Sequence, residues 1–172
     1  MDKMTQSDGR MDYGRFCSGL VSVGLWNGET EQTGEALCTA LGGRLPLSGQ
    51  QVTEYEAGYI YRIARDRLLI RSDTDETLFD RITSLVPNDQ AAVSDLSHAR
   101  KIVGLSGPDI PAIMSRVLPV DSSGVSLLEG HYVQTVLQDA VVLLHRETGQ
   151  TYSLMVPTSF AMSIVGRLQK NH

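Results

Sequence analysis

Residues 94–121 read SDLSHARKIVGLSGPDIPAIMSRVLPVD, and this stretch carries sharper structural signals than the rest of the chain. Its first part, extended back to residue 91, contains two apolar runs, 91–96 and 100–106, which are predicted strands. Ser97 and His98 lie between these runs, where the chain has to turn. We therefore expect two strands joined through a Ser97-His98 turn.

A helix is predicted directly after the second strand. Gly107 and Pro108 interrupt that strand, and Pro111 falls in the first helical turn, where its missing N–H costs least. Pro119 ends the helix. The apolar residues in between follow the i, i+3, i+4, i+7, i+8 spacing of a core-facing stripe: Ile110, Ile113, Met114, Val117 and Leu118. This helix is expected to pack against the sheet.

Similar signals extend outward in both directions. The further predicted strands are 59–65, 68–72, 132–138, 140–146 and 151–156. The further predicted helices are 33–41, 74–86 and a last one, capped by Thr158 or Ser159, that carries Phe160, Ile164, Val165 and Leu168. The sum is an α+β fold, with an antiparallel sheet and helices on one face.

The distribution of glycine suggests a division of the chain. Nine of the 16 glycines lie in the first fifty residues, and residues 1–32 show no sustained periodicity. We interpret 1–32 as an extended Gly-rich arm that is either disordered or ordered against another surface. Residues 33–172 are expected to form a single α+β domain.

Composition excludes several classes of function. The net charge is −5 with no basic stripe, which argues against a nucleic-acid partner. No apolar run approaches the roughly 18 residues that a membrane helix needs. The N-terminal stretch lacks the apolar core of a secretory signal, and Cys17 and Cys38 are isolated from each other. We expect a cytoplasmic protein with reduced thiols and no metal site.

The polar residues of segment 94–121 are the first candidates for catalysis. His98 needs a nucleophile or a carboxylate aimed at it to act as a base, and Asp95 qualifies only if the strands bring it back. Asp109 is expected to cap a helix and Asp121 to lie in a turn. The chain has no G-x-S-x-G elbow and no phosphate-binding loop motif. We therefore assign no catalytic, cofactor-binding or metal-binding residue.

Two further side chains have alternative interpretations. His145 lies on a predicted hairpin strand beside Arg146 and is expected at the surface. Trp26, the single tryptophan, lies in the Gly-rich arm. It is either an aromatic anchor for a partner or a local packing residue.

Several blocks of the sequence resemble a known fold family. They are ALGGRLPL (40–47), AVSDLSHARKIVGLSGPD (92–109), LPVD (118–121), EGHYVQTVLQDAVVLLHR (129–146) and YSLMVPTSFAMSIVGRL (152–168). In order and spacing they are similar to the N-terminal part of the aminomethyltransferase (folate-binding) fold. Within that fold they resemble the gamma subunits of heterotetrameric sarcosine oxidases.

The resemblance implies a non-catalytic, architectural subunit, with no activity expected of the isolated chain. Its partners would be alpha, beta and delta subunits, which would hold FAD, FMN, NAD, tetrahydrofolate and zinc. The complex would oxidise sarcosine or a related N-methyl amine to glycine, pass the one-carbon unit to tetrahydrofolate and form hydrogen peroxide. Trp26, Ser97 and His98 are expected at the subunit interface. The alternative is a freestanding tetrahydrofolate-binding or regulatory module without catalysis.

Overall fold

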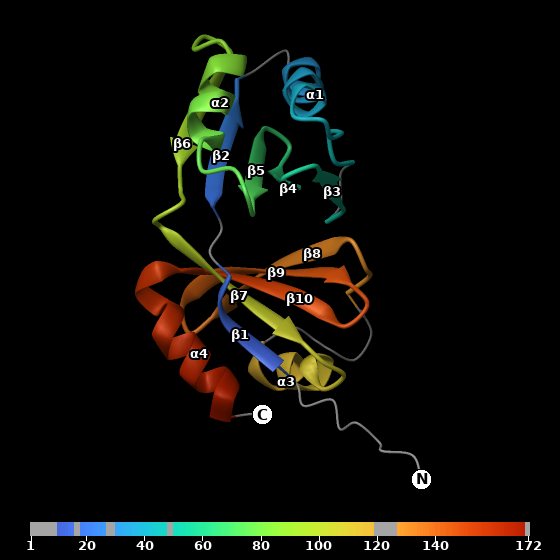
Figure 1. Cartoon of the computed structure of the whole chain (residues 1–172), viewed down its shortest axis with the longest axis vertical. Helices are drawn as coiled ribbons and strands as arrows, with labels where there is room; N and C mark the ends of the chain where they lie inside the picture. Colours follow the sequence, from blue (N-terminus) through green and yellow to red (C-terminus); the bar gives the residue numbers. More distant parts are fainter. Residues whose placement is uncertain (1–9, 16–17, 27–29, 48–49, 119–126, 171–172) are drawn as a thin grey trace. The chain divides into compact units, whose positions relative to one another are not determined.

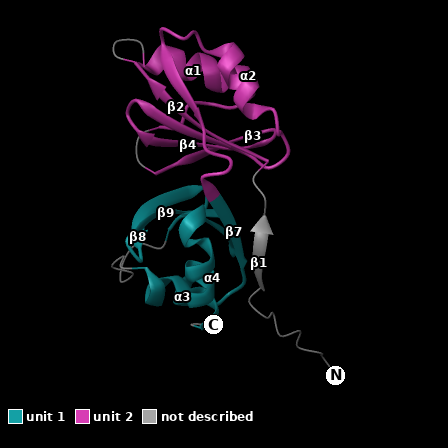
Figure 2. Cartoon of the chain, turned by 90° about the vertical axis from the view of Figure 1, so that its left-hand side faces the viewer, with its two compact units in different colours: residues 1–15, 101–172 teal, residues 16–100 magenta. Residues whose placement is uncertain are grey.

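The computed structural model describes residues 10–15, 18–26, 30–47, 50–118 and 127–170, with residues 10–15 described in their backbone only. The chain divides into two compact units (Figure 2). Unit 1 comprises residues 1–15 and 101–172, and unit 2 comprises residues 16–100. Each unit has its own five-stranded sheet and its own helices.

Unit 2 is a sheet with two helices on one face (Figure 1). The sheet order is β3-β4-β5-β2-β6. The bounds are β2 Gly19–Leu25, β3 Val52–Tyr55, β4 Gly58–Ala64, β5 Arg67–Ser72, β6 Ala91–Asp95, α1 Thr30–Ala40 and α2 Leu78–Leu85. Its core gathers buried residues of β2, β4, β5, α1 and α2, including Val21, Val23, Leu37, Ile60, Leu68, Ile70, Leu78 and Ile82.

The strand β2 is an interior strand of the unit 2 sheet. It pairs antiparallel with β5 on one side and with β6 on the other, and most of its residues are buried. Gly19 is required there, because an added Cβ would lie 2.8 Å from the carbonyl oxygen of Asp75 and 2.9 Å from Cβ of Leu78. The expectation of an extended arm over 1–32 therefore differs from the structure over residues 19–25.

Unit 1 also has two helices on one face of its sheet, as Figure 1 shows. The sheet order is β1-β7-β10-β9-β8. The bounds are β1 Arg10–Arg15, β7 Arg100–Ser106, β8 His131–Leu137, β9 Ala140–Thr148, β10 Thr151–Pro157, α3 Ile110–Val117, the short 3-10 turn η1 Thr158–Phe160 and α4 Ala161–Lys170. The stripe predicted for α3 is buried in this core, together with Ile164 and Leu168 of α4.

The elements predicted from residue 59 onward are present, with ends that differ from the predicted ones by no more than four residues, so the α+β class is confirmed. The arrangement differs in that the strands form two sheets rather than one, and the division into units does not fall at residue 32. The N-cap residue of η1 is Pro157, which makes no side-chain capping hydrogen bond, and capping of the last helix by Thr158 or Ser159 stays a prediction. Among the described residues, no helix is long and apolar enough to cross a membrane.

Candidate functional site

The Ser97 hydroxyl holds two strands of unit 2 together. Its Oγ accepts a hydrogen bond from the backbone N–H of Leu20 at 3.0 Å and donates one to Oδ1 of Asp95 at 2.6 Å. The backbone N–H of Ser97 donates to the same Oδ1 at 2.9 Å. This is a turn stabilised by an aspartate side chain, and it fixes the end of β6 against the start of β2.

The hydrogen bonds of this turn determine the protonation of Asp95 and its relation to His98. The hydrogen bond from the Ser97 hydroxyl, with that from its backbone N–H, lowers the pKa of Asp95, and nearby His98 lowers it further. The Ser97 proton is thus directed to Asp95, whereas a nucleophilic serine would donate its proton to a histidine base. His98 itself is exposed beyond the end of β6. The arrangement serves to shape the turn.

Trp26 lies at the opposite end of β2 from this turn. Its backbone N–H donates to the carbonyl of Gln90 at 3.0 Å, and its side chain is 57% exposed. Along the β2–β6 ladder Leu25 pairs with Ala91, whereas Leu20 lies beside Ser97. The structure therefore brings Ser97 and His98 together but does not bring Trp26 to them.

Asp109 and Asp121 are the remaining catalytic candidates from segment 94–121. Asp109 is the N-cap residue of α3, but its side chain makes no capping hydrogen bond. Asp121 lies outside the described residues. Among the described residues, no group of three His, Cys, Asp or Glu side chains is placed to hold a metal ion.

The prediction that His145 lies at the surface is wrong. Its side chain is 1% exposed, and Glu147 and Ser153 are also buried. In the register of the sheet His145 is opposite Ser153 on one side and Tyr132 on the other. Burial raises the pKa of Tyr132. A strand of alternating exposure would place His145 outward, but β9 is buried on both faces from Val142 to His145.

A second buried polar group lies in unit 2. Arg71 is completely buried and forms a bidentate ion pair with Asp73, Nε–Oδ1 at 2.7 Å and Nη2–Oδ2 at 3.1 Å. Its guanidinium lies 5.1 Å from the ring centroid of Tyr59, and the Tyr55 hydroxyl donates to its carbonyl at 3.1 Å. Pairing of this kind is what allows an arginine to be buried. Its role is therefore structural.

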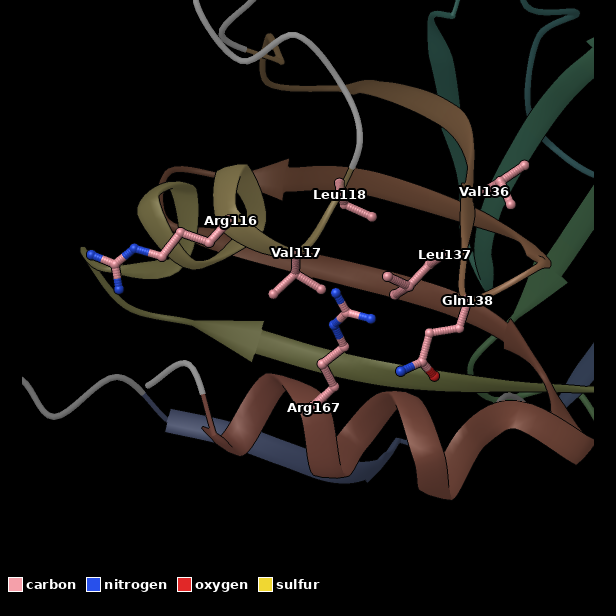
Figure 3. Close-up of a pocket in the computed structure, with 7 residues that line it drawn as sticks. All are labelled: Arg116, Val117, Leu118, Val136, Leu137, Gln138 and Arg167. Atoms are coloured by element: carbon pink, nitrogen blue, oxygen red, sulfur yellow. The ribbon is translucent and has the colours of Figure 1, made fainter.

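Unit 1 contains a pocket of about 310 Å³ between α3, α4 and the end of β8 (Figure 3). Its described lining residues are Arg116, Val117, Leu118, Val136, Leu137, Gln138 and Arg167. The Arg167 side chain points toward Val117 and Leu137, whereas the guanidinium of Arg116 extends away from the other labelled side chains. No motif in the sequence indicates this pocket, because its lining residues come from three separate segments of the chain.

Gln138 is held in this pocket by the turn on which it lies. Gln138 and Asp139 both have positive φ, 51° and 65°, as a two-residue hairpin turn between β8 and β9 requires. The Ser163 hydroxyl of α4 donates to Oε1 of Gln138 at 2.8 Å. The carbonyl end of the amide is thereby occupied, so its NH₂ group remains as the end that can donate elsewhere.

The chemistry of the pocket is that of a donor-lined surface. Arg167 and the Gln138 amide supply N–H donors, and Val117 and Leu137 supply buried apolar side chains. The described lining has no carboxylate, histidine, cysteine or hydroxyl that could act as a base or nucleophile. Such a pocket can bind a hydrogen-bond acceptor or an anion but offers no catalytic group.

Comparison with known proteins supports the expected resemblance. No family model matches the chain. The chain is 24% identical over 126 residues to the sarcosine oxidase subunit gamma of Corynebacterium sp. (strain U-96). That match covers 73% of this chain and 62% of the subunit, which is less than two thirds of its length.

Two solved structures share the fold. A chain of the heterotetrameric sarcosine oxidase from Corynebacterium sp. U-96, in complex with pyrrole 2-carboxylate, matches with a TM-score of 0.82 and 22% identity, over 95% of this chain and 83% of that one. The glycine cleavage system aminomethyltransferase T from Bartonella henselae matches with a TM-score of 0.64 and 17% identity, over 89% of this chain and 44% of that one. The resemblance to sarcosine oxidase gamma subunits and to the aminomethyltransferase fold is thus confirmed.

Proposed function

We propose that this chain is a non-catalytic gamma-type subunit of a heterotetrameric flavoenzyme. The observation that carries the proposal is the joint likeness, in sequence and in fold, to a sarcosine oxidase gamma subunit and to a chain of that heterotetramer. The use of Ser97 and Asp95 to fix a turn supports the architectural part of the proposal.

The proposed complex oxidises sarcosine or a related N-methyl amine. Glycine or the corresponding amine is the product, the one-carbon unit passes to tetrahydrofolate, and oxygen accepts the electrons to form hydrogen peroxide. In this proposal the alpha, beta and delta partners hold FAD, FMN, NAD, tetrahydrofolate and zinc, and this chain holds none of them. We further propose that the complex is cytoplasmic.

Interfaces of obligate complexes bury about 2,000 Å² or more and use exposed aromatic side chains as anchors. Trp26 fits that role because more than half of its side chain is exposed although it follows a buried strand. Ser97 and His98 lie at the other end of the same strand, so we propose two separate contact regions on unit 2.

The test is complementation of a host strain from which this gene has been deleted. Deletion is expected to abolish the assembled complex, and wild-type chain to restore it. His98→Ala is expected to lower the yield of assembled complex without changing turnover per bound flavin. Loss of turnover in a fully assembled, flavin-loaded His98→Ala complex would show that the chain takes part in the chemistry.

The competing function, a freestanding tetrahydrofolate-binding module, gives different results. It predicts a monomer that binds tetrahydrofolate without partners, which calorimetric titration of the isolated chain would detect. The described pocket in unit 1 has about 310 Å³, the lower end of the range for small-molecule sites, which argues against enclosure of a whole folate. We therefore favour the subunit.

A further inference from the structure

The unit 1 pocket presents hydrogen-bond donors at its centre. Arg167 is an exposed residue of α4 whose side chain points into the pocket, and its guanidinium has five N–H donors. It can therefore keep an intramolecular contact and still donate to a ligand. Beside it the Gln138 amide is oriented by the Ser163 hydroxyl, which occupies the carbonyl oxygen at 2.8 Å. A planar acceptor such as a carboxylate matches this pair of donors.

The rest of the pocket limits the size of the ligand. Val117, Leu118 and Leu137 are buried and form its apolar part. A volume of about 310 Å³ accommodates a side chain with its neighbouring atoms more readily than a cofactor. The chemistry is therefore that of a carboxylate carried on a short apolar stem.

Exposed apolar side chains on the β8–β9 hairpin and on α4 favour a protein as the source of that carboxylate. Val136 lines the pocket and pairs across the hairpin with Val141, and these side chains are 47% and 49% exposed. On α4, Met162 directly precedes Ser163 and is 83% exposed. The exposed Val136–Val141 pair beside the pocket is the kind of apolar surface that marks interaction sites.

The local charge also fits an acidic partner. The chain as a whole has a net charge of −5, yet α4 carries Arg167 and Lys170 in its last turn and α3 carries Arg116. Asp139, in the β8–β9 turn, is the acidic neighbour of Gln138. Electrostatic complementarity of this sort steers association and fixes register.

We propose that this pocket receives an aspartate or glutamate side chain, flanked by apolar residues, from a partner subunit. The inference rests on the proposed function, since it names one contact by which the chain holds its complex. Arg167 binds the carboxylate, and Ser163 acts as a positioning residue through Gln138. No catalytic role is assigned to any of them.

The test uses the full chain and the remaining subunits purified from the deletion strain. Binding is measured by titration for wild type, Arg167→Glu and Arg44→Glu. Arg44 is an exposed arginine of unit 2, so Arg44→Glu makes the same change in net charge away from the pocket. Arg167→Glu is expected to weaken binding at least about tenfold, and Arg44→Glu less than about twofold. The affinity of Arg167→Glu should also depend less on salt concentration than that of wild type, and the affinity of Arg44→Glu should not. Ser163→Ala should give an intermediate loss.

A second readout identifies the carboxylate directly. In an Arg167→Lys chain, a carbodiimide is expected to join the introduced lysine to an aspartate or glutamate of one partner, found by peptide mass spectrometry. Arg44→Lys is the matched control and should give no such product. Wild-type chain that fails to bind the other subunits would overturn the proposed function. Wild-type binding with equal affinities for Arg167→Glu and Arg44→Glu, and no cross-link at position 167, would overturn only the carboxylate site.

Discussion

At the scale of single residues, the hydrogen bonds of Ser97 distinguish it from its neighbour His98. Ser97→Ala removes the acceptor of the buried Leu20 N–H, whereas His98 is exposed. We expect Ser97→Ala to lower the free energy of unfolding by about 1–3 kcal/mol and His98→Ala by less than about 0.5 kcal/mol. Urea denaturation at pH 7 measures both. Equal effects of the two variants on the free energy of unfolding would contradict the structural role given to the Ser97 hydroxyl.

The Asp95 carboxylate adds a pH dependence to this comparison. Its pKa is lowered in the folded state, chiefly by the Ser97 hydroxyl. A lowered folded pKa contributes stability above the unfolded value of about 3.9, and that contribution is lost as the pH falls. The difference between wild type and Ser97→Ala should therefore narrow below about pH 4.

The buried thiol of Cys38 gives the opposite dependence at high pH. Burial in α1 raises its pKa from 9.0 to about 12. The pKa of the thiol is higher in the folded than in the unfolded state, so its contribution to the free energy of unfolding is complete below pH 9. That contribution is lost as the pH rises toward 12, by about 1.4 kcal/mol per pH unit. The stability difference between wild type and Cys38→Ala should narrow between pH 9 and 10.5. Parallel profiles over that range would exclude a buried thiol.

At the scale of elements, two glycines should respond oppositely to the same substitution. An alanine Cβ at Gly58 in β4 would lie 2.1 Å from the carbonyl oxygen of Arg71 in β5, while Gly166 in α4 has nothing within 4 Å of that position. Gly58→Ala should lower the free energy of unfolding by about 1–3 kcal/mol or more, because the paired strands must separate to make room for the added Cβ. Gly166→Ala should raise the free energy of unfolding by about 0.5–1 kcal/mol, because alanine favours a helix interior more than glycine does. Thermal unfolding measures both, and a neutral Gly58→Ala would contradict the described pairing.

The elements also show what sequence could and could not predict. The stripe of α3 and the β8–β9 hairpin follow from local periodicity and a two-residue turn, so they were predicted correctly. Gly19 and Gly24 made β2 resemble part of an extended Gly-rich arm, but in the structure Asp75 and Leu78 lie too close to Gly19 to leave room for a Cβ atom. Glycine in an interior strand and glycine in a linker have the same local signal.

The same limit applies to the candidate site. Ser97 and His98 are candidates from the sequence because they lie in one contiguous motif, and their place at an interface stays a prediction. The pocket was missed because Gln138 and Arg167 are brought together only by the packing of α4 beside the hairpin turn. The position of His145 beside Arg146 on a hairpin strand favours exposure, but β9 is buried on both faces there, which the local sequence does not show.

At the scale of the whole molecule, two units with separate sheets carry side chains suited to contacts at several places. Trp26 and the Ser97–His98 turn lie on unit 2, and the donor-lined pocket lies on unit 1. If these proposed contacts form, their distribution over both units fits a subunit that joins partners better than a module with one deep ligand site. Whether the chain assembles with flavin-bearing partners is therefore the central question.

Purification of the tagged chain from its native host, in moderate salt, answers that question most directly. The eluate is measured by intact mass and by flavin absorbance. We predict a yellow complex in which this chain is accompanied by three others, at equal stoichiometry. A colourless chain that elutes alone and folded would contradict the account.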